Sequence, residues 1–186
     1  MNPSTEDILK AVDLTPAEVV FVLPNNKNII MASQQAAELS GKQVIVLETK
    51  TVPQGITAML NFDPESDPES NQQMMTDSLA GVRTGSVTYA ARDSEFDGHP
   101  IKQGDHMALV EGKLLWADPK QTAVLKKLAE ELCSKESAYI TVLHGEGADE
   151  QSIADLEKAL QKAAPNAEVN VIHGGQPVYA FIVAVE

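Results

Sequence analysis

Two short polar stretches, each directly after an apolar run, contain the residues best suited to bind an anionic group. The stretches contribute Asn25, Asn26, Lys27 and Asn28 after VVFVL, and Thr49, Lys50, Gln54 and Gly55 after QVIVL. Lysine ammonium groups attract negative charge, and so do the free N–H groups at a helix amino terminus. The chemistry that these residues favour is therefore the binding of an anion such as a carboxylate.

The elements around the two stretches predict that they face each other. Residues 19–23 and 43–47 are continuous apolar runs typical of buried parallel strands. The segment 28–40 between them has helical spacing, with Ile29, Ala32, Ala36 and Leu39 on one face, and ends at Gly41. In open α/β sheets, ligands bind beyond the carboxyl ends of the strands. For each residue alone a local role is the alternative: Asn28 caps its helix, and Asn25 adopts a left-handed turn.

Two later loops form a second group of candidates for ligand or partner binding. Their residues are Arg92, Asp93, His173, Gly174, Gly175, Gln176 and Tyr179. We expect Arg92 and Asp93 to form a structural ion pair or to orient a ligand. HGGQP is either a hairpin turn or a corner whose backbone faces a partner. His144 and His173 each end an apolar strand, and their proximity is left open. No metal site and no nucleophile–base arrangement is predicted.

The rest of the chain predicts an α/β protein with two subdomains, residues 1–83 and 84–186. The first has a short parallel βαβ sheet and several helices. They include a short helix with Pro53 in its first turn and one over 71–82 with Met74 and Met75 facing inward. The second has a mixed sheet with an antiparallel meander and flanking helices. Because a two-stranded sheet is marginal by itself, we expect a piece of a longer protein or an oligomer.

Composition excludes several classes of partner. The 186 residues are 43% hydrophobic and carry a formal net charge of −13. This charge disfavours nucleic acid and anionic membrane surfaces, which attract basic proteins. The single cysteine, Cys133, has the spacing of a buried helix face, so we expect a core thiol. No signal peptide or membrane-spanning run is evident, and a reducing cytoplasm is the expected location.

Five segments, in this order, carry a resemblance to a known family: MNPSTEDIL, PNNKNI, ETKTVPQG, TGSVTYAARD and HGGQPVY. Together they resemble the carboxy-terminal, DAK1/DegV-like region of the fatty acid kinase A subunit. That family is also labelled dihydroxyacetone kinase-like or Dak phosphatase. The resemblance implies a noncatalytic domain that docks a DegV-like fatty acid-binding protein. It also implies that ATP and magnesium bind only to an amino-terminal domain outside this chain, and that the full protein is a homodimer.

Two alternatives to docking stay open. One is a kinase or phosphatase-related domain acting on a dihydroxyacetone-type substrate. In the related kinases that chemistry uses a covalently bound histidine, and none of the four histidines lies in a motif recognisable for it. The other alternative is a domain whose main role is dimerisation.

Overall fold

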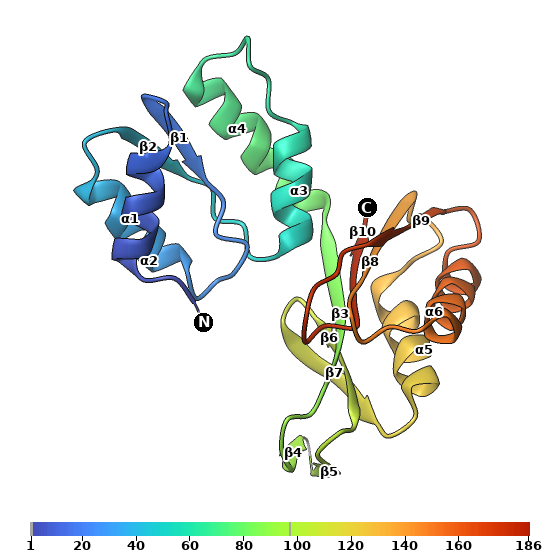
Figure 1. The fold of residues 1–186 in the computed structure, drawn as a ribbon. Helices are drawn as coiled ribbons and strands as arrows, with labels where there is room; N and C mark the ends of the chain where they lie inside the picture. The colour runs from blue at the N-terminus through green and yellow to red at the C-terminus, as the bar shows by residue number, and fades with distance from the viewer. Residues whose placement is uncertain (1, 97) are drawn as a thin grey trace. The chain divides into compact units, whose positions relative to one another are not determined.

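The computed structural model of this protein describes residues 2–96 and 98–186, which form two compact units. The first unit is Met1–Val82 and the second is Arg83–Glu186. Each unit combines helices with a sheet (Figure 1), so the predicted α/β class is confirmed. The division lies one residue before the expected position.

The first unit is built around two short parallel strands. Its elements are α1 (Thr5–Leu14), β1 (Val19–Val22), α2 (Ile30–Leu39), β2 (Gln43–Val46), α3 (Val52–Leu60), α4 (Pro68–Ser78) and the 3-10 turn η1 (Leu79–Gly81). Strand β1 pairs with β2 in parallel, with Val19 opposite Gln43 and Val22 opposite Val46. The βαβ unit predicted from the sequence is therefore present.

Helices cover both faces of this small sheet. Ile45 and Leu47 pack with Ala58 of α3 and Met75 of α4, and β1 adds Phe21 to the same cluster. On the other face, α1 and α2 pack together and bury Ile8, Val12 and Ala36. Burial on both faces explains why the two strand sequences are continuously apolar instead of alternating.

Three local expectations for this unit were wrong. Helix α2 begins at Ile30 after an N-cap, Ile29, that makes no side-chain cap, so Asn28 does not cap it. Met74 is 39% exposed, because α4 turns only Met75 fully into the core. Leu39, placed on the buried face by its spacing, is 69% exposed at the end of α2.

The second unit contains a six-stranded mixed sheet. Its elements are β3 (Arg83–Tyr89), β4 (Ser94–Phe96), β5 (His99–Ile101), β6 (His106–Val110), β7 (Lys113–Asp118), α5 (Gln121–Leu132), β8 (Tyr139–His144), α6 (Glu150–Ala163), β9 (Glu168–His173) and β10 (Phe181–Val185). The strand order is β7-β6-β3-β10-β8-β9, and only the β8–β9 pair is parallel. Strands β4 and β5 form a separate hairpin.

Helices α5 and α6 pack against each other and supply most of the helical side of the core (Figure 1). Leu128 and Leu132 of α5 lie so close to Gly85 of β3 that an added Cβ would be 2.7 and 2.8 Å from their methyl groups. Cys133 lies at the end of α5 and packs against this core. Burial raises the pKa of its thiol to about 11, consistent with the expected core thiol.

The chain order of the strands differs from their spatial order near the carboxyl terminus. Strand β10 lies between β3 and β8, and β9 pairs only with β8. The HGGQP segment therefore crosses from one side of β8 to the other and is not a hairpin turn. The expected meander is correct for β6 and β7, but β3 pairs with β6 and leaves β4–β5 as a side hairpin.

The amino terminus of α6 gives the folded chain a predictable acid sensitivity. The Ser152 amide donates to the Asp149 carboxylate (N···Oδ1, 2.8 Å), and hydrogen bonding to Ser152 lowers the Asp149 pKa below its usual 3.8. As pH falls, the Asp149 carboxylate therefore becomes protonated at a higher pH in the unfolded chain than in the folded chain. The stabilising contribution is complete above the unfolded pKa and is lost as pH falls through the lower folded pKa.

We expect Asp149→Asn, which keeps a capping oxygen but cannot titrate, to flatten the loss of stability below about pH 4. Urea unfolding of both chains at pH 7 and pH 3 measures this. Glu157→Gln, in the middle of the same helix, is the control for losing one negative charge. An equal pH dependence in the wild type and Asp149→Asn would contradict the assignment.

Candidate functional site

The two polar stretches that follow β1 and β2 meet at one end of the small sheet. The Asn25 amide donates to the hydroxyl of Thr49 (N···Oγ1, 2.9 Å), and Thr49 is completely buried. Thr49 thus joins the loop after β2 to the loop after β1. Parallel pairing requires this proximity, because both strands end at the same edge.

Asn25 and Gly55 fit each other closely. Asn25 has a φ of 54°, a left-handed conformation that asparagine tolerates better than most residues. A Cβ at Gly55 would lie 2.1 Å from the Asn25 Oδ1 atom, so only glycine fits there. This Oδ1 atom is buried and has no hydrogen-bond partner among the described residues. A buried acceptor without a partner is unusual in folded proteins, and such a group is often found at functional positions.

The remaining predicted residues of these loops occupy the surface around that contact. Lys27, Asn28 and Lys50 are exposed. The Asn26 side chain accepts from the Asn28 amide (2.9 Å), and the Gln54 side chain accepts from the Lys50 amide (2.7 Å), so both side chains shape their own loops. Helix α3 begins beside them at the Thr51 cap, with Pro53 in its first turn as expected.

The lysines of the first unit differ in role. This unit contains four of the chain's lysines and no arginine. Lys42 is a structural residue, because its ammonium group donates to the carbonyl groups of Val12, Asp13 and Thr15 at the end of α1. Lys27 and Lys50 extend from the loops after β1 and β2 instead, and an ammonium group there is available to an anionic ligand.

An apolar surface formed by α3 adjoins the polar loops, and its place on α3 was not predicted from the sequence. Four residues of α3 that lie on one helix face, Val52, Ile56, Met59 and Leu60, are all exposed, with Leu60 at 80%. Together with Leu23, Asn25 and Gly55 they line an open pocket. The available signal was their spacing of four, seven and eight residues, which suggests a core face. In the structure a different face of α3, with Pro53, Gly55 and Ala58, packs on the core.

The second group of candidates gathers at one end of the six-stranded sheet. Tyr89 lies opposite His106, and His144 lies opposite both Phe181 and His173. The loops after β3, β8 and β9 therefore leave the sheet at the same end. The Thr88 hydroxyl joins two of them by donating to the Val178 carbonyl (2.8 Å).

The HGGQP loop is held tightly against the end of β8. The Gly174 and Gly175 amides both donate to the His144 carbonyl (2.9 and 3.2 Å), and the Gln176 side chain donates to the Leu143 carbonyl (2.9 Å). Val178 and Gly175 have positive φ values of 71° and 62°. A left-handed valine is strained, and such strain is concentrated at functional sites. Tyr179 beside it is exposed.

His144 and His173 are neighbours, which answers the question left open by the sequence. Their ring centroids are 4.8 Å apart. Within residues 2–96 and 98–186, no group of three or more histidine, cysteine or acidic side chains is arranged to hold a metal ion. The pair therefore offers two imidazole groups at the rim of the HGGQP loop.

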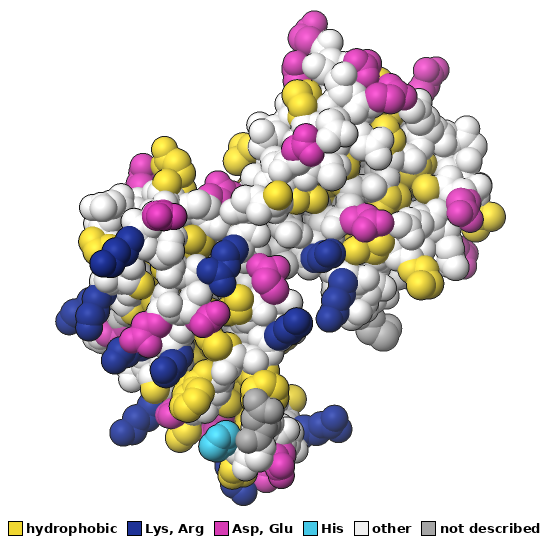
Figure 2. Space-filling model, turned by 180° about the vertical axis from the view of Figure 1, so that it is seen from behind, with side chains coloured by type: hydrophobic (Ala, Val, Ile, Leu, Met, Phe, Trp, Pro, Cys, Tyr) yellow, Lys and Arg dark blue, Asp and Glu magenta, His cyan; other side chains and the backbone are white. Residues whose placement is uncertain are grey.

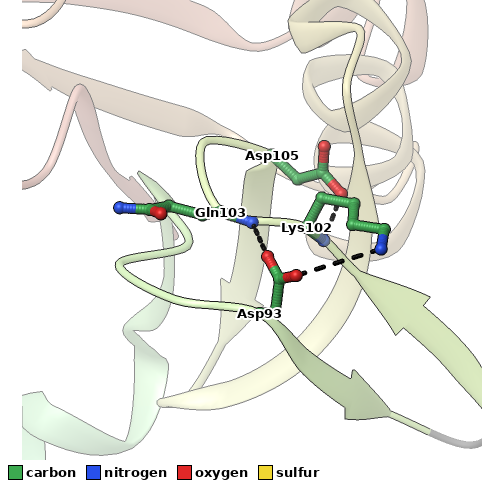
Figure 3. A network of polar contacts seen from close by, with 4 residues as sticks. All are labelled: Asp93, Lys102, Gln103 and Asp105. Carbon is green, nitrogen blue, oxygen red and sulfur yellow. Dashed lines mark hydrogen bonds and ion pairs between the residues drawn. The ribbon is translucent and has the colours of Figure 1, made fainter.

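Arg92 and Asp93 do not form the expected ion pair with each other. Asp93 accepts a hydrogen bond from the Gln103 amide (2.7 Å) and lies 3.9 Å from the Lys102 ammonium group, while Asp105 accepts from the Lys102 amide (Figure 3). Asp93 thus joins the segment before β4 to the segment after β5, whereas Arg92 is exposed. Both side chains of the Asp93–Lys102 pair are largely exposed, so their charge interaction contributes little stability.

The described residues include no helix that is long and apolar enough to cross a membrane. What the geometry offers chemically is binding. The first unit presents a pocket lined by Asn25 and by an apolar face of α3, and two exposed lysines on the loops that follow β1 and β2. The second presents a strained loop with the exposed side chains of Tyr179 and His173 and the half-buried imidazole of His144.

Comparison with known proteins identifies the family. The sequence pattern of the FakA-like carboxy-terminal region, from proteins similar to the A subunit of fatty acid kinase, matches residues 1–186. Protein YloV of Bacillus subtilis is 41% identical over 186 residues, and an uncharacterized protein of Staphylococcus saprophyticus is 42% identical over the same length. Both alignments cover 100% of this chain and 34% of the length of the relative. The chain therefore spans about a third of the length of these curated relatives.

Solved structures show the same fold at low sequence identity. The fatty acid kinase B3 protein of Streptococcus pneumoniae, loaded with linoleic acid, has a TM-score of 0.69 and 15% identity, with 99% of this chain and 76% of that chain covered. TM841 of Thermotoga maritima gives 0.68 and 16%, covering 100% and 76%. The dihydroxyacetone kinase of C. freundii gives 0.65 and 13%, covering 98% and 41%. The fold is DegV-like, and the match over all 186 residues shows that this chain belongs to the family of FakA-like carboxy-terminal regions of fatty acid kinases.

Proposed function

We propose that this chain is the docking region of a fatty acid kinase and receives a DegV-like protein that carries the fatty acid. The single observation that carries the proposal is the meeting of the loops after β1 and β2 at the Asn25–Thr49–Gly55 contact. That contact fixes the backbone from which Lys27 and Lys50 extend. Membership of the kinase family supplies the context, and the solved fatty acid kinase B3 protein is the type of partner that the proposal requires.

Electrostatics supports a surface of this kind. The chain has a net charge of −13, so an acidic partner meets general repulsion from it. Two exposed lysines on adjoining loops offset this repulsion locally and attract a carboxylate or an acidic loop of the partner. Charges at the rim of an interface mainly set the association rate and the orientation of the partner.

The proposal places phosphoryl transfer outside this chain. ATP and magnesium then bind to the part of the longer protein that lies beyond these 186 residues, and this chain positions the fatty acid carrier. The homodimer expected from the family resemblance is compatible with docking, because a charged loop surface and an apolar helix face serve different contacts.

We expect Lys27→Ala combined with Lys50→Ala to weaken binding of a fatty acid-loaded DegV-like protein about tenfold, or about 1.4 kcal/mol. Both side chains are exposed, so the melting temperature should stay unchanged. Titration calorimetry at low salt measures the affinity, and the loss should shrink at high salt, where surface charges are screened.

The matched control removes two exposed lysines of α6 in the second unit, Lys158→Ala with Lys162→Ala. This control changes the net charge equally but leaves the loops after β1 and β2 intact. If the two double variants bind the partner equally well, Lys27 and Lys50 are not part of the docking surface.

The contact beneath the lysines can be tested separately. Gly55→Ala places a methyl group where the Asn25 side chain lies, so Asn25 must move and its left-handed loop must change. We expect a loss of about 1–3 kcal/mol in stability, the usual cost of overpacking, together with weaker partner binding. Gly41→Ala is the control, because a Cβ there meets nothing within 4 Å. Unchanged stability and unchanged partner binding in Gly55→Ala would contradict the role given to this contact.

The dihydroxyacetone-type alternative makes an opposite prediction in a simple experiment. If the His144–His173 pair at the HGGQP loop binds such a substrate, dihydroxyacetone raises the melting temperature and His173→Ala abolishes the shift. We expect no shift with dihydroxyacetone. A large one would overturn the docking proposal in favour of a small-molecule site.

A further inference from the structure

The His144–His173 pair is the starting point for a further inference, which is independent of the docking proposal. Strands β8 and β9 pair in parallel, and the two histidines lie directly opposite each other in that register. Because side chains alternate between the two faces along each strand, residues at paired positions point to the same face of the sheet. The pairing therefore holds two imidazole rings side by side at the carboxyl ends of β8 and β9.

The backbone beneath the two rings is fixed by hydrogen bonds. The Gly174 and Gly175 amides both donate to the His144 carbonyl, so the chain that leaves β9 turns back onto the end of β8. The Gly145 amide donates to the Ala180 carbonyl (2.9 Å), which joins the end of β8 to the residue before β10. A ligand that binds between the rings therefore meets side chains whose Cα atoms are already held in place.

Both imidazole groups are available to a ligand. Among the described residues, no hydrogen bond or ion pair occupies a ring nitrogen of either histidine, and the two rings contact each other. His173 is exposed and His144 is half-buried, so ions in solution can reach the pair. Gly175 keeps the space beside the outer ring open, because a Cβ added there would lie 3.6 Å from the His173 Nε2 atom.

The separation of the two rings matches the separation that a shared metal ion imposes. A metal ion lies about 2.0–2.1 Å from an imidazole nitrogen, which places it roughly 3.2 Å from the ring centre. With an angle of about 90–110° between the two metal–nitrogen bonds, the ring centres are then roughly 4.5–5.2 Å apart. The observed centroids are 4.8 Å apart, and the ring planes are inclined at 49°. The sheet thus already sets the rings at the distance of a chelating pair.

Ligand type and charge narrow the choice of ion. Imidazole nitrogen suits Zn²⁺, Cu²⁺ and Ni²⁺, whereas Mg²⁺ and Ca²⁺ prefer oxygen ligands. The net charge of −13 favours a cation. On the face seen in Figure 2, acidic side chains are exposed on both parts of the molecule, with lysine and arginine side chains among them. Glu146, an exposed carboxylate, follows β8 beside the HGGQP loop, because its amide donates to the Gln176 carbonyl (3.2 Å).

We propose that His144 and His173 bind a divalent transition metal ion of the class that includes zinc. The two imidazoles supply two ligands, and water completes the coordination, since no third histidine, cysteine or acidic side chain is arranged with them among the described residues. Such an ion exchanges with solution, unlike one held by four protein ligands. While bound, it ties the end of β9 and the HGGQP loop to the end of β8. The sequence left the proximity of the two histidines open and therefore predicted no such site.

Titration calorimetry of Zn²⁺ into the 186-residue chain tests the proposal. We expect one ion to bind per chain. His144→Ala and His173→Ala should each weaken binding at least tenfold, because only one imidazole is then left at the site. The matched control is His99→Ala, which removes an exposed histidine of β5 and leaves the pair intact. This control should bind zinc as the unaltered chain does.

Nuclear magnetic resonance of the unaltered chain identifies the ligands without removing the half-buried His144. Zinc should shift the ring proton signals of His144 and His173 and leave those of His99 and His106 unchanged. An absence of binding at millimolar zinc would overturn the proposal. It would also be overturned by binding that survives His144→Ala or His173→Ala, by an equal loss of binding in His99→Ala, or by zinc-dependent shifts confined to the other two histidines.

Discussion

The first unit depends on one constraint, the parallel pairing of β1 with β2. Among the described residues, no further strand joins this sheet. Parallel strands end at the same edge of a sheet, so the pairing of Val22 with Val46 places the following loops side by side. The buried Thr49 hydroxyl and the close approach of Asn25 to Gly55 are consequences of that register. The register thus creates a polar surface at one end of the sheet.

A two-stranded sheet cannot supply much stability from its own hydrogen bonds. The first unit compensates by burying both faces of the sheet under helices, with Ile45, Leu47, Ala58 and Met75 as the core of one side. This arrangement leaves apolar side chains of helix α3 exposed. Its small residues Pro53, Gly55 and Ala58 face the core closely, so its larger apolar residues are left on the outside. Neighbouring exposed apolar side chains on one helix face are typical of an interaction surface.

Local patterns predicted most of the elements, because hydrophobic spacing and caps act within a few residues. The βαβ unit, Pro53 in the first turn of α3, and the helices α5 and α6 follow from such patterns. The pairing of strands that are distant in the sequence was harder to predict. Nothing in HGGQP indicates that β10 inserts between β3 and β8, and nothing in the Arg92–Asp93 neighbour pair indicates that Asp93 turns toward Lys102. These outcomes depend on which strands become neighbours, which single-sequence periodicity does not encode.

The candidate site shows the same division between local and long-range information. The alignment of two loops beyond parallel strands is a topological rule, so the meeting of Asn25 with Thr49 was foreseeable. The exposed apolar face of α3 was not foreseen, because apolar residues at helical spacing are usually assigned to the core. Which face of a helix packs on the sheet depends on contacts with residues distant in the sequence. Polar and apolar surfaces also contribute differently to association. The two lysines act at a distance, mainly on the association rate and the orientation of the partner, and their contribution to affinity falls as salt screens them. Burial of Ile56, Met59 and Leu60 acts only at contact, at roughly 25 cal/mol for each Å² of apolar area removed from water. A lasting assembly on this unit therefore requires the apolar surface, and the charged loops decide chiefly which molecule arrives and how it is oriented.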